Sequence, residues 1–351
     1  MRLHGRVAAR FAGPAMLVAV LAFPPGAAAA SGFRDRVFSG PVARSSELRG
    51  ATPAKKFFTA DGIAVEARVS QSVSNPDAVA QEIVTFLGSR VHGLELGKLR
   101  VFIGVPSEIS NACGGDSDVL ACYSAGERRM YIPDRDPGSG SSAGFTRNYA
   151  ITHEYGHHIA NFRSNAPFPA LNFGAKYWSS YKFVCAGADQ GLYFPGNQGT
   201  HYLDDPGEAF ADSYAHLPEN GFSNVPWQFN ERLRPDAGAF AALRRDVLDP
   251  WRSSTRKVVT GSLNSRHRSR TTSFRTSLDG TVDLRLRGPA SANFDVGIYD
   301  GSRLVSRTRK ADSRDRLRLT VCRESSPTAT ARVRVIRRTG AGAYRLTMLF
   351  P

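Results

Sequence analysis

The sequence has few cysteines and, after its first thirty residues, no long hydrophobic run. Its 351 residues include four cysteines, and no two of them are spaced as C-x-x-C. Because that spacing is typical of cysteine-ligated zinc, we expect no such site. No stretch after residue 30 has the roughly 20 apolar residues that cross a bilayer. The length allows two domains with separate cores.

The first thirty residues contain no acidic side chain. Arg2, Arg6 and Arg10 are followed by an apolar run at residues 11–23 and by four alanines at residues 27–30. Basic, apolar and small residues in this order are typical of a secretory signal peptide. A membrane anchor is the alternative, but the run is too short for a span and Pro14 interrupts it. We therefore expect a signal peptide at residues 1–30 and a secreted, extracellular protein.

An even number of cysteines in a secreted chain favours disulfide bonds. Four cysteines allow three pairings. A Gly-Gly-Asp turn at residues 114–116 lies between Cys113 and Cys122, which favours that pair. Cys185 would then bond to Cys322 and join two distant parts of the chain.

Charge and periodicity divide the chain into segments. The formal charge is +3 for residues 1–30, −3 for residues 31–250 and +15 for residues 251–351. Residues 31–60 lack periodicity and are expected to form an extended arm or linker. Strand and helix signals alternate through residues 61–250, which predicts an α+β domain. From residue 251 apolar and polar residues alternate, which predicts a small all-β sandwich domain.

The pentapeptide at residues 153–157, His-Glu-Tyr-Gly-His, is the most informative motif. On a helix, His153 and His157 share one face with Cβ atoms about 5–6 Å apart, so both imidazoles can bind one zinc ion. Glu154 flanks that face, where a carboxylate can act as general base. The apolar residues of the expected helix, residues 146–162, lie on the opposite face. We therefore expect the histidines to face a cleft, and His158 to pack in the core.

A catalytic zinc usually takes a third protein ligand. The motif H-E-x-x-H-x-x-G-x-x-H is excluded, because Ala160 and Arg163 occupy its last two defined positions. The best candidate is Glu208, on a second helix that begins after Asp205 and has Asp212 on the same face. Glu208 could instead complete a capping box, but capping does not explain Asp212.

The two motifs together, H-E-x-x-H at residues 153–157 and E-x-x-A-D at residues 208–212, resemble those of the gluzincin zinc metallopeptidases. The wording His-Glu-Tyr-Gly-His-His is similar to that of bacterial neutral zinc metallopeptidases. The resemblance implies a zincin-like domain with His153, His157 and Glu208 as zinc ligands and Glu154 as the base. Asp212 would orient His153. The implied substrate is a peptide or protein.

Two further elements of such a site remain open. The strand expected at residues 129–133 has the charges and the proline of an edge strand, and could hold substrate by strand pairing. The group that stabilises the oxyanion is not determined by sequence. The candidates are His201, Tyr202, Tyr214 and His216.

The basic segment, residues 251–351, resembles a pre-peptidase C-terminal domain, on the stretch at residues 293–300 and the closing G-x-G-x-Y-x-L at residues 340–346. Its arginines could line a solvated strand face, or attach the protein to anionic cell-envelope polymer or a membrane surface. No recognition helix or base-stacking motif predicts specific nucleic-acid binding. The oligomeric state stays open.

The sequence therefore predicts a secreted endopeptidase with one catalytic Zn²⁺, which hydrolyses peptide bonds with a metal-activated water and Glu154 as general base. The alternative comes from another functional class. It is a catalytically silent zincin-like protein that binds anionic surface polymers through residues 251–351.

Overall fold

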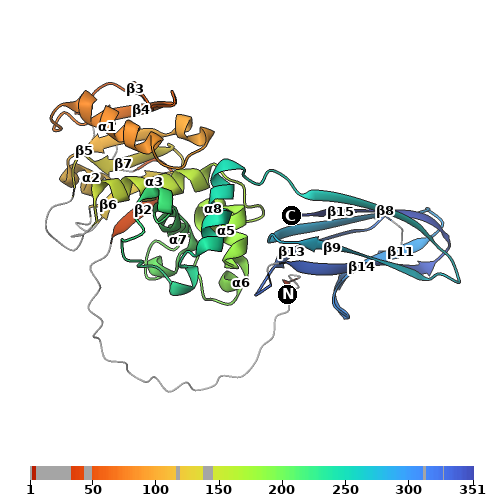
Figure 1. Ribbon diagram of the computed structural model, residues 1–351. Coiled ribbons are helices and arrows are strands. Elements are labelled where there is room, and N and C mark those ends of the chain that lie inside the picture. Colours follow the sequence, from red (N-terminus) through yellow and green to blue (C-terminus); the bar gives the residue numbers. More distant parts are fainter. Residues whose placement is uncertain are drawn as a thin grey trace, which may run out of the picture.

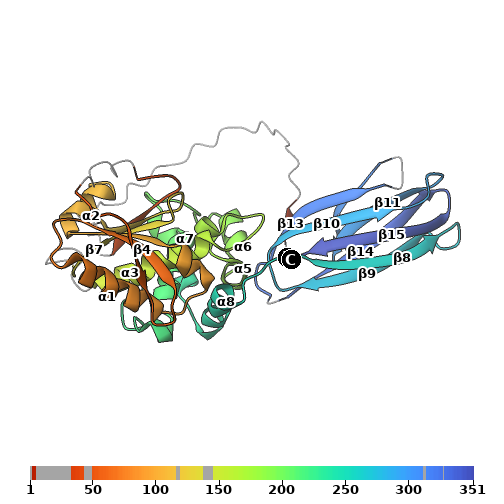
Figure 2. The same cartoon turned by 90° about the horizontal axis from the view of Figure 1, so that it is seen from above.

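The chain forms two units, each with its own hydrophobic core (Figure 1). The computed structural model describes residues 2–4, 33–42, 50–115, 119–136, 145–310, 314–326 and 328–351. One core is built from residues between 33 and 247, in a mixed α/β unit, and the other from residues between 263 and 350, in antiparallel sheets. Figure 2 shows the sheet unit extending away from the side on which α5, α6 and α8 lie.

The α/β unit contains a six-stranded mixed sheet of order β2-β6-β7-β5-β4-β3. Strands β4, β5 and β7 are parallel to one another. Strand β3 is antiparallel to β4, β6 is antiparallel to β7, and β2 is parallel to β6. The strands are β2 (Arg34–Phe38), β3 (Lys55–Phe58), β4 (Ala64–Val69), β5 (Arg100–Gly104), β6 (Val119–Ser124) and β7 (Arg129–Pro133).

Helices cover both faces of this sheet. Side chains alternate along β5, so that Val101 and Ile103 join the core under α1 and α3 while Phe102 joins the smaller core under α2. Residues 145–249 add a helical layer beside α3. The helices are α1 (Pro76–Gly88), α2 (Pro106–Ala112), α3 (Arg147–Asn161), α4 (Ala170–Phe173), α5 (Lys176–Tyr181), α6 (Val184–Asp189), α7 (Pro206–Ala215) and α8 (Ala237–Leu248), with 3-10 turns at Leu94–Lys98, Tyr202–Asp204, Pro218–Asn220 and Glu231–Leu233.

Two expectations from the sequence differ from the structure. Residues 31–60 are not only an arm, because they contribute β2 and β3 to the sheet. The segment Arg129–Pro133 is not an edge strand, because β7 pairs with both β5 and β6. The charge of Arg129, at the start of this strand, is balanced by an ion pair with Glu127 at 3.0 Å.

The C-terminal unit consists of two antiparallel sheets with a shared core. One sheet has the order β1-β13-β10-β15-β8 and the other β12-β11-β14-β9. The strands are β1 (Arg2–His4), β8 (Thr255–Leu263), β9 (Ser269–Thr276), β10 (Gly280–Arg287), β11 (Asn293–Asp300), β12 (Arg303–Arg307), β13 (Arg316–Cys322), β14 (Ala329–Thr339) and β15 (Gly342–Phe350). Except for β1, the signal peptide expected at residues 1–30 lies outside the described residues.

The structure contains two disulfide bonds. Their pairing is the one that the Gly-Gly-Asp sequence at residues 114–116 favours. Cys113 bonds to Cys122 within the α/β unit, and Cys185 bonds to Cys322 between the units. Two disulfides are consistent with an oxidising, extracellular environment. None of the helices in the described part of the chain combines the length and apolarity that a membrane span needs.

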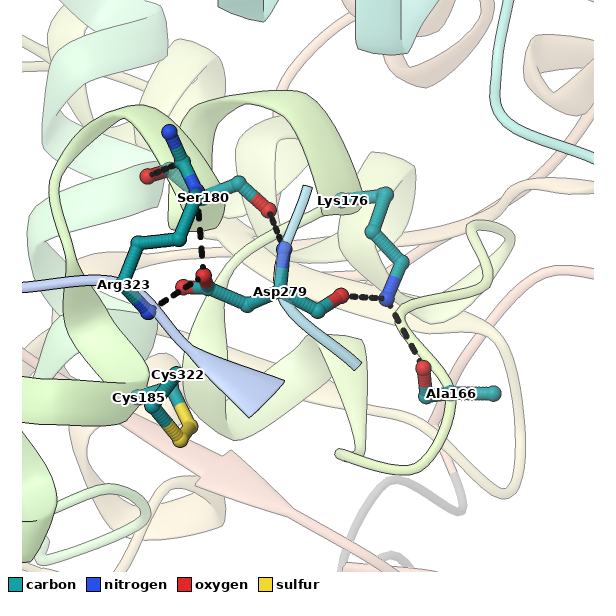
Figure 3. Close-up of a disulfide and its surroundings, with 7 residues drawn as sticks. All are labelled: Ala166, Lys176, Ser180, Cys185, Asp279, Cys322 and Arg323. Atoms are coloured by element: carbon teal, nitrogen blue, oxygen red, sulfur yellow. Dashed lines mark hydrogen bonds and ion pairs between the residues drawn. A yellow bond between two sulfur atoms is a disulfide. The ribbon is translucent and has the colours of Figure 1, made fainter. Parts of the chain in front are cut away.

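Buried polar groups connect the two units beside the second disulfide (Figure 3). Lys176 donates hydrogen bonds of 2.8 Å to the carbonyl oxygens of Ala166 and Asp279. Arg323 forms an ion pair with the Asp279 carboxylate at 3.2 Å. Because a buried charge is costly unless it is paired, these contacts fix one arrangement of the units.

Candidate metal centre

Helix α3 carries the two histidines and begins where the sequence predicts. Thr146 caps it by accepting a hydrogen bond from the backbone N–H of Tyr149. Every residue from Tyr149 to Ala160 is buried. The prediction that the histidines face an open cleft is therefore wrong. Residues 33–42 and the loop that contains Phe229 cover the polar face: the ring centroids of Phe33 and Phe229 lie 4.8 and 6.3 Å from that of His153.

Helix α7 brings Glu208 to the histidines. Asp205 caps this helix, with its side chain accepting from Gly207 N–H at 2.8 Å, and Pro206 occupies the first turn. The helix can approach α3 closely because residue 156 is glycine: a Cβ there would lie only 2.7 Å from Ala211 Cα.

Three side chains converge on one point. His157 Nε2 lies 3.2 Å from both His153 Nε2 and Glu208 Oε2, and His153 Nε2 lies 3.3 Å from Glu208 Oε2. Ligands bound at about 2.0–2.1 Å in a tetrahedral site are separated by about 3.4 Å. The spacing of these donors therefore fits one metal ion.

Asp35 on β2 is the fourth member of the cluster. Its Oδ2 lies 3.1 Å from His157 Nε2 and 3.7 Å from His153 Nε2. The four donor groups are buried, and their candidate ligand atoms all lie within 4.8 Å of one another, so they could hold a metal ion. Asp35 is not among the metal ligands that the sequence motifs predict. The sequence contains a signal for this residue. Side chains two residues apart lie on the same face of a strand, so Asp35 shares a face with the apolar residues Phe33 and Val37.

Groups around the cluster hold the donors in position. Asp212 Oδ1 lies 3.5 Å from His153 Nδ1 and accepts a hydrogen bond from the Tyr149 hydroxyl. Glu208 Oε1 accepts a hydrogen bond of 2.6 Å from Gln198 Nε2. Such partners fix the orientation of metal-binding side chains.

Glu154 is fully buried, and within the described residues neither of its carboxylate oxygens has a hydrogen-bond partner. Burial, followed by the charge of Asp35, raises the pKa of Glu154 well above its usual range. Buried polar groups are nearly always satisfied, so a carboxylate without a partner indicates a group or water that is not part of the chain.

The four candidates for oxyanion stabilisation differ in whether they contact the cluster. Only Tyr202 reaches the cluster, where its hydroxyl donates a 2.6 Å hydrogen bond to Asp35 Oδ1. The Tyr214 hydroxyl donates to Val91 O, and His216 Nε2 lies 2.8 Å from Val225 O. The His201 side chain is 43% exposed and its ring stacks on Phe194.

His158 packs in the core, as expected, and does not join the cluster. Its Nδ1 lies 3.0 Å from the Tyr123 hydroxyl and its Nε2 lies 2.9 Å from Glu95 O. Burial lowers the pKa of His158 to about 4, so the ring is neutral at neutral pH. A cavity of about 740 Å³ lies between α5, α6, α8 and the C-terminal unit, away from these residues.

Comparisons with known proteins add little to this geometry. No family model and no curated protein matches the sequence. One solved structure that is similar to part of the chain is the pre-peptidase C-terminal domain of a collagenase from Bacillus anthracis, with 11% identity over 26% of this chain and 87% of that one. Its TM-score is 0.23, which does not establish a shared fold.

Proposed function

We propose that the protein is a secreted zinc-dependent endopeptidase, with His153, His157 and Glu208 as zinc ligands. The observation that carries the proposal is the convergence of these three donors, 3.2–3.3 Å apart, beside a buried carboxylate. Two imidazoles and a carboxylate are a donor set that zinc prefers. A zinc ion at this point would polarise a peptide carbonyl and make a bound water more acidic.

The chain's own groups then have defined roles. Glu154 takes the proton of the attacking water and returns it to the leaving amine. Asp212, supported by Tyr149, keeps the His153 ring in one orientation. The Tyr202 hydroxyl, which reaches the cluster through Asp35, is the proposed oxyanion donor.

A second candidate is favoured by the closure of the cluster. Four protein donors without an open position are typical of structural zinc sites. In that case the protein is catalytically silent, and the C-terminal unit carries the function. Its residues 251–351 have a formal charge of +15 and would bind anionic polymer or membrane surfaces.

Substitution of Glu154 separates the two candidates. Full-length protein is loaded with zinc and incubated with a mixed peptide library, with and without a chelator. For the endopeptidase, Glu154→Gln retains zinc and loses about 10²–10⁴-fold in hydrolysis rate. Hydrolysis at the wild-type rate by this variant would refute the mechanism. Absence of any chelator-sensitive cleavage by wild type and by an Asp35→Asn variant, together with salt-sensitive binding of the chain to anionic polymer, would support the second candidate.

A further inference from the structure

Residues 33–42 form a strip of extended chain beside the metal centre. Strand β2 pairs with β6, and beyond it Ala125 N–H donates to Phe38 O and Ser124 Oγ donates to Gly40 O, both at 2.8 Å. Both ends are buried, with Phe33 at 1% and Val42 at 2% exposure. The strip is therefore anchored along its length and not only at Asp35.

The strip contacts groups that a hydrolase needs to have available for substrate and water. Asp35 Oδ2 lies 3.1 Å from His157 Nε2, which makes it a fourth donor at the point where the other three converge. Asp35 Oδ1 accepts the hydrogen bond of Tyr202. A catalytic zinc keeps one coordination position open, and here a carboxylate of the chain itself occupies the place.

The strip also covers the edge of the sheet. Without β2, β6 is the outermost strand, because its other neighbour is β7. An uncovered edge strand presents unpaired N–H and C=O groups, which bind extended peptides by strand addition. Figure 1 shows β2 next to α3 and α7, so the covered edge runs past the metal centre.

We propose that residues 33–42 are a built-in inhibitor of the peptidase, with Asp35 as a fourth protein ligand in the substrate position and β2 in place of substrate on β6. The proposal rests on the proposed zinc peptidase function and deepens it. The substrate is an extended peptide that pairs with β6. The strip has to leave this edge before such a peptide can bind.

The occupied position can be probed without measuring hydrolysis. Full-length protein is loaded with Co²⁺, and its visible absorption is followed during titration with acetohydroxamate, a small ligand that needs an open metal position. The variants are Asp35→Ala and Asp35→Asn, of which the second retains an acceptor for Tyr202. Arg34→Ala is the matched control, because Arg34 is exposed on the same strand.

We expect both Asp35 variants to hold one Co²⁺ and to bind acetohydroxamate at least about tenfold more tightly than wild type. The reason is that the state with an open metal position is no longer a minor one. Arg34→Ala should bind it as wild type does. Unchanged acetohydroxamate affinity in both Asp35 variants would overturn the proposal, as would loss of the metal from both, which would make Asp35 a structural ligand.

The same variants separate the inhibitor from the proposed function. Asp35 variants that bind acetohydroxamate tightly but cleave no peptide in the library would retain the open metal position and leave β2 as the remaining block to substrate. Failure of wild type to bind Co²⁺ at all would instead refute the zinc peptidase. Chelator-sensitive cleavage by wild type and Asp35 variants at equal rates would retain the peptidase and refute the inhibitor.

Discussion

Replacing Gly156 with alanine tests how the third donor reaches the histidines. The added Cβ would lie 2.7 Å from Ala211 Cα, 3.0 Å from its carbonyl oxygen and 3.1 Å from its Cβ. Carbon atoms pack at about 3.5–4.0 Å, so α7 has to retreat by roughly 1 Å. A metal site tolerates deviations of about 0.2 Å in its ligand distances. Because Glu208 moves with α7, we expect zinc affinity to fall at least about tenfold.

The stability of the metal-free protein should change less than its zinc affinity. Overpacking costs about 1–3 kcal/mol, while alanine in a helix interior is favoured over glycine by about 1 kcal/mol. The assays are competition with a chromophoric zinc chelator and denaturant unfolding of metal-free protein. Gly50→Ala is the control, because a Cβ at Gly50 meets only Gln71 Oε1, at 3.8 Å. A Gly156→Ala variant with wild-type zinc affinity would refute the role of the close helix approach.

Three further predictions concern the metal, its support and the junction between the units. Asp212→Asn should weaken zinc binding about 10–100-fold with Glu208 unchanged, measured by the same competition assay, since it removes the carboxylate beside His153. Zinc at 100 times its dissociation constant should stabilise the protein by about 2.7 kcal/mol in thermal unfolding, and His157→Ala should abolish this gain; equal stabilisation of both proteins would contradict the site. Replacing Cys185 and Cys322 with serine should cost about 2–5 kcal/mol in denaturant unfolding, because this disulfide spans 137 residues; unchanged unfolding would mean that the buried contacts alone hold the junction.

The helical parts of the site could be predicted from sequence because their signals are local. Thr146 and Asp205 are N-cap residues, and both helices begin beside them in the structure. The spacing of His153 and His157 places both on one face of α3. Glu208 meets them because the two helices pack against each other, which the small residue Gly156 permits.

The covering strand could not be predicted in the same way. Strand β2 has five residues and pairs in parallel with β6, which begins at Val119, so nothing near it in sequence indicates a partner. Asp35 lies between Arg34 and Arg36, which makes the segment resemble a solvated arm. Because the sequence does not predict β2, it favours β7 as the edge strand. In the structure, β6 and β2 both lie beyond β7 in the sheet.

The zinc content of the purified full-length protein tests the central claim most directly. Metal analysis by atomic emission after exposure to zinc and removal of unbound ions should give one zinc per chain for wild type and none for His157→Ala. A wild-type chain that retains no zinc, or a His157→Ala variant that retains as much as wild type, would contradict a zinc site made by His153, His157 and Glu208.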